Sequence, residues 1–518
     1  MSLARDITTV GSGTLMSRLL GFARDACIAA LLGTGPFSEA FFAVLQVINF
    51  FRRLLAEGAL NSAFVPIWLG LRNGEDGQAN ADRFTKRTLL TIGGATAVAA
   101  FAATIFASLV IATIAPGFDE TRRVVASFYL EIVAPYIVLA GLVAVIAAAL
   151  NAEGRVAAVT VSTIMFNLVV LVALGLVFRE REGFLISIWL VLAIVAAGLS
   201  QVLITGVTWL ATGKRLQRVK SRAPDPSRLF FARAIPGLIA AGIPQLKLIA
   251  AAAIASSSAA GVSWLYYANR LYELPLGVVS IAIAAVIVPR IAASLRGSDA
   301  SAFAGVQSRA YEIALGLALP AAAGFALLAP PIAGGLFQRG AFTPNDTTAV
   351  AAALAAICAG LPGHVLEKVF GAVSFAHEDT KTPMIAALCG LAAAIAGGIL
   401  LFPYYGHVGV AAAIAISGWV GASVLGLVLY HRDWLRLDAN ARRRLPRIVL
   451  ATAVMGAVVG AGLAAGHRLF PAAAVTSPGR LAILFILVAL GVTIYAGALQ
   501  LLGVTKLKDL TAALRARD

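Results

Sequence analysis

The chain has 518 residues, of which 60% are hydrophobic and only 13% are charged. Soluble domains carry about 25% charged residues, so this composition excludes a water-soluble globule and indicates an integral membrane protein. The 41 Lys and Arg residues outnumber the 25 Asp and Glu residues and give a net charge of +16. In a soluble protein such an excess would favour a nucleic-acid partner, but in a membrane protein it first reports orientation.

Apolar stretches long enough to cross a bilayer recur along the whole chain. A membrane-spanning helix needs about 20 mainly apolar residues, and fourteen stretches meet this requirement. We therefore predict an all-α polytopic fold with fourteen transmembrane helices. The predicted spans are residues 6–32, 38–70, 88–116, 124–150, 156–178, 184–211, 230–256, 262–289, 311–337, 347–376, 382–403, 407–430, 448–467 and 481–503.

The basic residues between these spans predict the orientation. Of the 41 Lys and Arg residues, 27 lie on the side that holds both termini, 7 lie on the opposite side and 7 lie within spans. Because basic residues collect in cytoplasmic loops, both termini are expected in the cytoplasm. Topology thus accounts for the positive charge, and nucleic-acid binding has no support.

Polar interruptions divide the chain into five segments. The longest interruption, residues 212–233, is the predicted cytoplasmic linker between a six-helix N-lobe at 1–211 and a six-helix C-lobe at 234–430. A basic cytoplasmic loop at 431–447 precedes two C-terminal helices and a cytoplasmic tail at 448–518.

A short internal likeness favours a duplicated six-helix lobe. The second span ends in AFVPIW (63–68) and the eighth in VIVPRI (286–291), so a Val-Pro pair is expected to close the second helix of each lobe. Because six is even, both lobes would enter the membrane from the same side, as parallel repeats.

Seven basic residues fall inside predicted spans. They are Arg18, Arg24, Arg52, Arg53, Lys247, Arg270 and Lys368. A charge buried in a span costs several kcal/mol, so such a group normally faces a partner or a water-filled cavity. The first two spans hold four of these residues together with Asp25, Glu39 and Glu57, and no other pair of spans approaches this density.

Three of these arginines are predicted to bind an anion. At 1.5 Å per residue, Arg24 lies about 27 Å into the first span, and Arg52 about 21 Å into the second, which runs the other way. Arg270 lies about 12 Å from the outer end of its span, so the three side chains can converge from both lobes. Guanidinium groups bind phosphate bidentately, and several together suit a pyrophosphate. Asp25 is expected to orient Arg24 or to exchange partners when the substrate leaves.

Two ion pairs have both a structural and a functional interpretation. Arg53 and Glu57 lie four residues apart on one helix face, and Arg270 and Glu273 lie three apart. Each pair either holds helices together or takes part in binding.

Three further positions are secondary candidates. Arg18, nearer the cytoplasm than Arg24, is either an entry or gate contact or a contact to lipid headgroups. Glu39 lies at an outer helix start, where capping is the default interpretation and a gate contact the alternative. Lys368 lies in a span that is expected to kink at Pro362.

The sequence predicts no catalytic residue, metal site or cofactor. The five His and three Cys residues are dispersed without metal-ligand spacing, and no GxxxxGK[ST] phosphate loop occurs. The pattern is therefore that of a transporter rather than an enzyme.

Five stretches resemble the MurJ (MviN) family of lipid II flippases, a branch of the multidrug/oligosaccharidyl-lipid/polysaccharide (MOP) exporter superfamily. They are SRLLGFARD (17–25), FFRRLLAEGALNSAFVP (50–66), YYANRLYELPLGVVSIAIAAVIVP (266–289), LFQRGAFTPND (336–346) and FAHEDTKTP (375–383). The resemblance implies two six-helix lobes in a V, with the last two helices lining a groove for a polyprenyl tail.

The resemblance also implies roles for particular residues. The central cationic residues of the family match Arg24, Asp25, Arg52 and Arg270. Further functional positions by similarity are Arg18, Arg53, Glu39 and Glu57. Some relatives have an acid before the third central arginine, where this chain has Asn269. The seventh span contains no Asp or Glu, so no cation site is expected there. The energy source stays open, with the membrane potential as one candidate.

The function implied is a lipid II flippase of the bacterial cytoplasmic (inner) membrane. It would move undecaprenyl-pyrophosphate-linked disaccharide-pentapeptide from the inner to the outer leaflet by alternating access, with membrane lipids and cell-wall synthesis proteins as further partners. Three alternatives remain open: a flippase for another polyprenyl-linked glycan, a cation-coupled multidrug exporter, and a non-transporting scaffold for cell-wall synthases.

Overall fold

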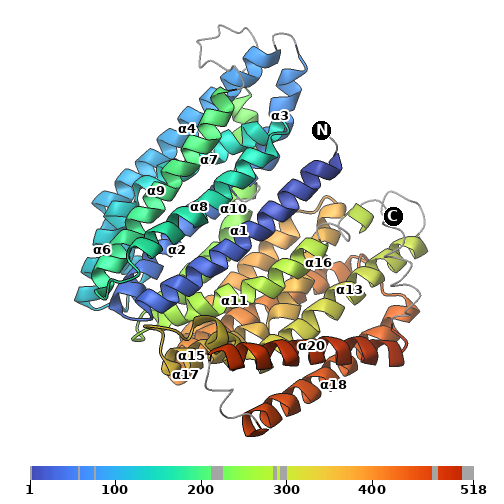
Figure 1. The fold of residues 1–518 in the computed structure, drawn as a ribbon. Helices are drawn as coiled ribbons and strands as arrows, with labels where there is room; N and C mark the ends of the chain where they lie inside the picture. Colours follow the sequence, from blue (N-terminus) through green and yellow to red (C-terminus); the bar gives the residue numbers. More distant parts are fainter. Residues whose placement is uncertain are drawn as a thin grey trace. The chain divides into compact units, whose positions relative to one another are not determined.

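The computed structural model describes residues 3–56, 59–74, 77–211, 226–283, 289–291, 300–469 and 477–504. Every regular element in these ranges is a helix, which confirms the all-α class (Figure 1). Glu57 and most of the expected linker at 212–233 lie outside the described residues.

The helix boundaries are as follows. The helices are α1 (Leu3–Leu32), α2 (Pro36–Ala56), α3 (Ala59–Arg72), α4 (Gly77–Ile105), α5 (Ala107–Ile114), α6 (Glu120–Val133), α7 (Pro135–Ala152), α8 (Val156–Leu176), α9 (Gly183–Leu210), α10 (Ser227–Ala255), α11 (Gly261–Ala282), α13 (Ala300–Leu327), α14 (Ala329–Phe337), α15 (Pro344–Cys358), α16 (Leu361–Ala376), α17 (Lys381–His431), α18 (Ala439–Leu469) and α20 (Ser477–Leu501).

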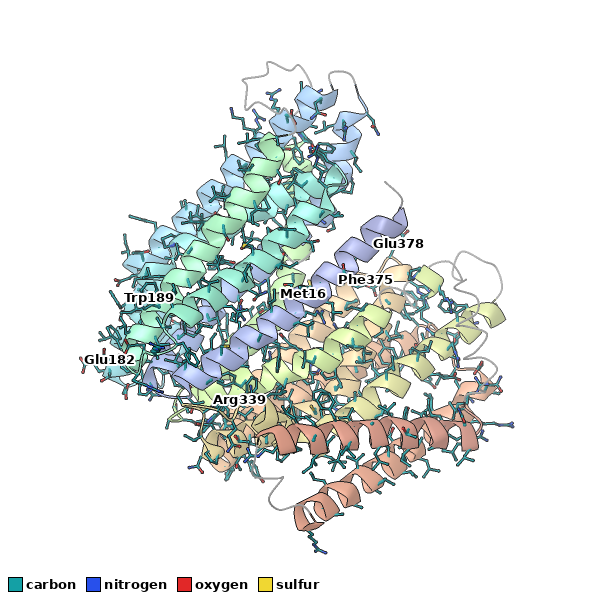
Figure 2. The ribbon with its side chains drawn as sticks, viewed as in Figure 1. Met16, Glu182, Trp189, Arg339, Phe375 and Glu378 are labelled. Carbon is teal, nitrogen blue, oxygen red and sulfur yellow. The ribbon has the colours of Figure 1, made fainter. Side chains whose placement is uncertain are left out.

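Ten helical segments among the described residues are long and apolar enough to cross a membrane. They are Pro36–Arg72, Gly77–Ile105, Pro135–Ala152, Val156–Leu176, Gly183–Leu210, Phe303–Leu327, Pro344–Ala376, Lys381–His431, Ala439–Gly466 and Gly479–Leu501. Large apolar side chains are exposed on these segments, among them Trp189 of α9 and Phe375 of α16, and Met16 of α1 is exposed as well (Figure 2). Soluble monomers rarely expose extended apolar surface, whereas a surface that faces lipid requires it.

Several predicted spans consist of two helices in the structure. In three of them the second helix has a proline in its first turn: Pro135 in α7, Pro330 in α14 and Pro362 in α16. Proline is tolerated there because the backbone N–H that it lacks has no helical partner in a first turn. The expected kink at Pro362 is therefore confirmed as a break between α15 and α16.

The prediction that a Val-Pro pair ends the second span was wrong. Pro66 lies inside α3, and the helix continues to Arg72. A proline in a membrane helix removes one backbone hydrogen bond, but neighbouring helices and local adjustment can compensate for that loss, so it need not end the helix. Residues 284–288, which include the first three of the six residues of the second match (286–291), lie outside the described residues.

The chain forms two compact units. The first unit comprises Met1–Ser263 with Arg339–Phe342, and the second comprises Trp264–Gln338 with Thr343–Asp518. In the first unit, α1 packs against α8, and α2 packs against α6, α7 and α10. Helix α10, which follows the expected linker, thus packs within the first unit.

Aromatic stacking fixes the position of α10 against α3 and α4. The ring centroids of Phe64 and Phe84 lie 4.9 Å apart, and Phe230 of α10 lies 5.7 Å from Phe84. All three side chains are buried, and such aromatic pairs contribute about 1 kcal/mol beyond their buried area.

In the second unit, α17 folds back on itself. A straight helix of its 51 residues would extend about 77 Å, more than twice the hydrocarbon thickness. Gly406 interrupts it with φ 54° and ψ −137°, between the predicted spans at 382–403 and 407–430. The Arg432 Nη1 and Asp379 Oδ2 atoms, which lie just beyond its two ends, are 2.5 Å apart. The two ends of α17 therefore lie close to each other.

The last two helices are attached to α13 and α14 of the same unit. Helix α18 packs against α13, and α20 packs against both α18 and α14. Arg444 of α18 contacts Glu312 of α13 at 3.3 Å, and the Tyr495 hydroxyl of α20 donates to the Gly316 carbonyl at 2.7 Å. The C-terminal hairpin is thus held to α13 by polar contacts as well as by apolar packing.

Asp379 connects the two ends of α17, and the contacts that do so lower its pKa. Its carboxylate accepts hydrogen bonds from the backbone N–H groups of Lys381 and Thr382, each at 3.0 Å, and from Arg432. Burial raises its pKa, but the hydrogen bonds from Thr382 and Arg432 and the Arg432 charge outweigh that effect and lower the pKa to about 2. The resulting stabilisation is present above the ordinary aspartate pKa of about 4 and is lost as the pH falls toward 2.

We expect Asp379→Ala to lower the free energy of unfolding by about 1 kcal/mol at pH 7, because the first turn of α17 loses its acceptor. Thermal unfolding of the detergent-solubilised protein measures this change. Asp379→Asn is the matched control: it keeps an acceptor oxygen, so its loss should be smaller, and neither variant should show the wild-type loss between about pH 4 and pH 2. Wild-type stability of Asp379→Ala at pH 7 would contradict this role.

Candidate functional site

A polar cluster of the first unit surrounds Arg24 on α1. Its Nη2 and Nε atoms donate to Asp25 Oδ1 at 2.7 and 3.0 Å, and its Nη1 atom donates to Asn167 Oδ1 of α8 at 3.1 Å. Asp25 is fully buried, whereas 13% of the Arg24 side chain is exposed. Arg24 also lies over the Phe166 ring, 6.0 Å from its centroid. The guanidinium is therefore oriented by two acceptors while part of it stays accessible.

Asn167 is a functional candidate that the sequence analysis missed. Its side-chain amide donates to the Ser17 carbonyl at 3.2 Å and to the Ser17 hydroxyl at 3.3 Å, while its oxygen accepts from Arg24. It thus ties two turns of α1 to α8. The available signal was a single buried asparagine in the apolar stretch of α8, because a polar side chain at membrane depth normally has a partner.

Arg52 lies near the same cluster. Its Nη2 and Nε atoms lie 3.3 and 3.4 Å from Asn49 Oδ1, one turn earlier on α2. Buried Tyr136 of α7 interacts electrostatically with both Arg52 and Arg24, and its ring packs on Phe166 at 5.9 Å. Two of the three predicted arginines, Arg24 on α1 and Arg52 on α2, therefore lie in the first unit.

The remaining predicted residues of the first unit differ in their surroundings. Arg18 is exposed on α1, and Arg53 is half-buried on α2. The predicted Arg53–Glu57 pair involves a residue outside the described ranges, so it stays a prediction.

Arg270 belongs to the second unit. Its Nη1 atom lies 3.2 Å from Glu273 Oε2, which confirms the predicted ion pair on α11, and about a quarter of each side chain is exposed. Asn269, which replaces the acid of some relatives, lies 3.5 Å from the other Glu273 oxygen. Glu273 therefore partners both residues, as Asp25 partners Arg24.

Lys368 lies on α16 in the same unit. It is exposed, and its Nζ atom donates to the Ser280 hydroxyl of α11 at 2.8 Å. One turn before Lys368, His364 Nδ1 lies 2.8 Å from the Tyr272 hydroxyl of α11. These contacts fix the arginine-bearing helix α11 against α16.

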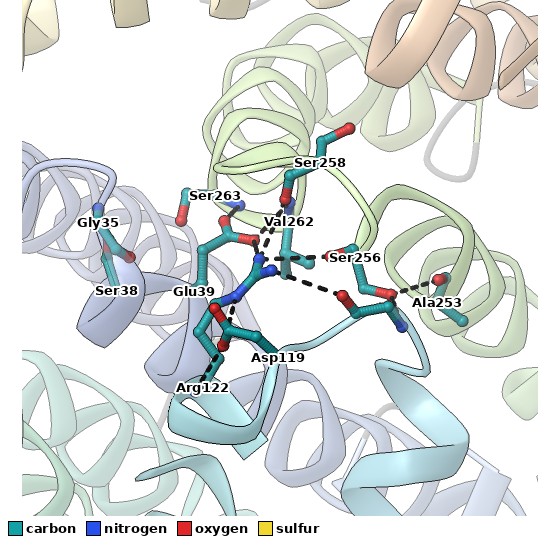
Figure 3. Close-up of polar contacts among 11 residues, drawn as sticks. Gly35, Ser38, Glu39, Asp119, Arg122, Ala253, Ser256, Ser258, Val262 and Ser263 are labelled. Atoms are coloured by element: carbon teal, nitrogen blue, oxygen red, sulfur yellow. Dashed lines mark hydrogen bonds and ion pairs between the residues drawn. The ribbon is translucent and has the colours of Figure 1, made fainter. Parts of the chain in front are cut away.

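Glu39 caps a helix, but a different one from the expected α2. Its carboxylate accepts from the backbone N–H groups of Ser263 at 2.6 Å and Val262 at 3.3 Å, which belong to the first turn of α11 (Figure 3). These N–H groups would otherwise lack a helical partner. Glu39 does lie in the first turn of α2, as expected, but its carboxylate caps the first turn of α11, whose unsatisfied donors lie within its reach.

Arg122 completes the cluster around Glu39. Its Nη1 atom donates to the Ser258 carbonyl at 3.1 Å and the Ser256 carbonyl at 3.4 Å, and lies 4.0 Å from Glu39 Oε2 (Figure 3). Its Nε atom lies 3.2 Å from Asp119, the N-cap of α6, whose pKa is lowered mainly by the hydrogen bond from the Arg122 backbone N–H. The turn between α10 and α11 is thus held by α2 and α6 through one carboxylate and one guanidinium.

The family model described as "Lipid II flippase MurJ" matches residues 28–470 of this chain. A protein of Rhizobium meliloti named probable lipid II flippase MurJ is 36% identical over 465 residues, which cover 89% of this chain and 86% of that protein. A Vibrio cholerae protein of the same name is 30% identical over 518 residues, with 97% of both chains covered.

Two solved structures share the fold. The structure titled "Lipid II flippase MurJ, inward closed conformation" superposes with a TM-score of 0.76 at 21% identity and covers 94% of this chain and 97% of its own. The inward-facing structure of a multidrug resistance MATE family transporter of the MOP superfamily gives a TM-score of 0.65 at 16% identity, with 80% of this chain and 94% of that chain covered.

We expect Asn167→Ala to weaken binding of an anion at Arg24 about tenfold, because the guanidinium loses an orienting acceptor. Calorimetric titration of the purified protein with geranyl pyrophosphate, a soluble prenyl pyrophosphate, measures this effect. Thr163→Ala is the matched control: Thr163 is exposed on the same helix, and its hydroxyl donates to the carbonyl one turn earlier. Equal affinities of wild type and Asn167→Ala would show that Asn167 does not position Arg24.

Proposed function

Because this chain belongs to the MurJ family of lipid II flippases, we propose that it moves undecaprenyl-pyrophosphate-linked disaccharide-pentapeptide from the inner to the outer leaflet by alternating access. The chain is a multi-pass protein of the cytoplasmic (inner) membrane, in keeping with its family and with the ten apolar helical segments found among the described residues. Its activity is transport rather than catalysis. Cell-wall synthesis proteins that consume the exported unit are proposed as further partners.

The observation that carries this proposal is the setting of Arg24. Eight residues, or about 12 Å of helix, separate it from the end of α1, so in the proposed topology it lies at membrane depth. A permanent cation there is costly and marks a path for polar groups. Asp25 and Asn167 hold the guanidinium in a defined orientation, and part of it remains exposed. A pyrophosphate is an anion that can replace or join the Asp25 carboxylate as its partner.

Arg52 and Arg270 are proposed to complete the headgroup site. Arg52 lies in the first unit together with Arg24, and about a quarter of the Arg270 side chain is exposed. A substrate carrying two phosphates offers enough oxygens for three guanidinium groups. When the site is empty, the carboxylates of Asp25 and Glu273 reduce the repulsion between the cations. Arg18, Arg53, Glu57 and Lys368 are proposed as secondary contacts along the path.

The proposed topology has fourteen spans with both termini in the cytoplasm. Ten apolar segments are present among the described residues, and α17 contributes two spans because it folds back at Gly406. Helices α1, α10 and α11 are each more than 20 residues long, and the Ala241–Ala255 part of α10 is apolar. Counting these three and dividing α17 gives fourteen.

The polyprenyl tail is proposed to stay in lipid beside the last two helices. Apolar side chains of α18 and α20, such as Val454, Phe485 and Val492, are exposed, and a lipid tail needs such a surface. The lobes are proposed at 1–211 and 234–430, and the 212–233 and 431–447 segments as cytoplasmic connections.

Glu39 is proposed to act at the outer gate. Its bonds to the first turn of α11 close the turn between α10 and α11 onto α2, and these bonds have to break when the cavity opens outward. The Arg122 guanidinium is held by the same turn.

A flippase for a different polyprenyl-linked glycan shares the pyrophosphate chemistry and differs only in the sugar-peptide part. A multidrug exporter is favoured by the structural likeness to a MATE transporter, but the charges around Arg24 suit an anion better than the organic cations that such exporters carry. Membrane potential is the proposed energy source, since one charge moved across 100 mV is worth about 2.3 kcal/mol.

We expect Arg24→Lys and Arg270→Lys each to abolish most lipid II export, because a lysine keeps the charge but lacks the bidentate fork. Leaflet accessibility of lipid II, measured in cells whose only copy is the variant, reports the loss. Arg181→Lys, in the loop between α8 and α9, is the control and should export normally. Normal export by either deep variant at wild-type expression would contradict the transport assignment.

We expect Glu39→Ala to shift the protein toward the outward-open state, because the first-turn N–H groups of α11 lose their acceptor. Labelling of a Ser263→Cys reporter by a membrane-impermeant thiosulfonate measures the shift, in a background with Cys27, Cys358 and Cys389 replaced by alanine. Ser263 is fully buried in the closed contact, so its labelling should rise several-fold. Glu39→Gln, which keeps one acceptor oxygen, should lie between wild type and Glu39→Ala. Unchanged labelling in Glu39→Ala would rule out a gate role.

A further inference from the structure

The C-terminal end of α1 is capped by backbone atoms from a distant part of the sequence. Helix α1 ends at Leu32, and the carbonyl groups of its last turn have no partner in their own helix. The Ala30 carbonyl accepts a hydrogen bond of 2.8 Å from the backbone N–H of Ala341. Ala341 lies in the Arg339–Phe342 loop, which connects α14 to α15 and belongs to the first unit.

Two glycines make this approach possible. Gly33, just after α1, has φ 60°, and Gly340 in the loop has φ 57°, a conformation that side chains disfavour. A Cβ atom on Gly33 would lie 2.6 Å from the Ala341 carbonyl oxygen, and one on Gly340 would overlap the Ala30 carbonyl oxygen. Both positions therefore disfavour any side chain for two reasons: the backbone φ is positive, and a Cβ atom would collide with the neighbouring backbone.

The loop is itself well fixed. The backbone N–H of Phe342 donates to the Arg339 carbonyl at 3.1 Å, which closes a tight turn, and the Phe342 side chain is 2% exposed. The next residue, Thr343, begins the capping box that starts α15. Ala341 is thus presented to α1 by a short, ordered turn.

We propose that the Arg339–Phe342 loop and Gly33 form a backbone latch that holds the outer end of α1 and opens and closes once in each transport cycle. This inference rests on the proposed topology and alternating access. Helix α1 carries Arg24 and Asp25. The position of its C-terminal end therefore determines whether these two residues are accessible from the inner or from the outer side of the membrane. One backbone hydrogen bond between two ordered segments is weak enough to break in every cycle.

The latch differs in chemistry from the contact that Glu39 makes. Its hydrogen bond joins two uncharged backbone groups, Ala341 N–H and Ala30 C=O, so neither partner can gain or lose a proton, whereas a carboxylate contact responds to pH. It also depends on backbone atoms at Ala30 and Ala341, so only the two glycines are restricted in side-chain size.

The first experiment introduces a Cβ atom into the latch. Gly340→Ala is combined with the Ser263→Cys reporter in the background without native cysteines, and labelling from outside is measured in cells. We expect labelling to rise about tenfold, which corresponds to about 1.4 kcal/mol of destabilisation of the latched state. Gly33→Ala should have the same effect from the other side of the contact.

Gly35→Ala is the matched control. Gly35 lies two residues after Gly33, its added Cβ would meet no atom within 4 Å, and its backbone has no positive φ. It should label at the wild-type level. Wild-type labelling and wild-type lipid II export in both Gly340→Ala and Gly33→Ala would overturn the latch. Failure of lipid II export in the wild type itself would instead overturn the proposed function.

A measurement on the wild-type protein does not depend on whether the variants fold. Hydrogen exchange of the peptide that contains Ala341 should be slow, because its N–H is bonded to Ala30. The loop at 177–182, between α8 and α9, is the reference for the hydrogen-exchange rate of an exposed loop. Exchange of the Ala341 amide as fast as in that loop would overturn the latch.

Discussion

The structure depends on one constraint: a guanidinium within a membrane helix must have polar partners in every state of the protein. Arg24 meets it with Asp25 on its own helix and Asn167 on α8. Because Asn167 also holds Ser17, the partners of the cation attach α1 to α8 over more than one turn. A group that is expensive to bury thus determines the packing of the helix that carries it. Arg270 likewise has a carboxylate partner on its own helix, Glu273, one turn away on α11.

The contacts near the ends of α1, α2 and α11 are directed at backbone atoms. Glu39 accepts from the N–H groups of α11, Arg122 donates to carbonyl groups of the preceding turn, and Ala341 donates to the end of α1. Helix termini supply such unsatisfied groups without any particular side chain. A proposed gate built in this way can close firmly while leaving the partner residues free to vary.

Much of the site was predictable because charges are conspicuous in apolar helices. The free-energy cost of a charge in a membrane helix is enough to single out Arg24, Asp25, Arg52 and Arg270. The spacing of Arg270 and Glu273 predicts their ion pair. The break at Pro362 follows from proline chemistry.

The partners across long sequence distances were not predictable. Asn167 stands out as the one asparagine of apolar α8, but its partners, Arg24 and Ser17, are identified only by the structure. Glu39 looks like a cap of its own helix, because nothing local shows that the first turn of α11 lies beside it. Gly33 and Gly340 resemble ordinary packing glycines until their positive φ angles and mutual contact are seen.

The fold-back of α17 at Gly406 has a consequence for membrane insertion. Since both ends of the hairpin lie together, its two arms add an even number of crossings and leave the direction of every later helix unchanged. The sides of the membrane that α18 and α20 face are therefore set by the helices before α17 and not by this hairpin.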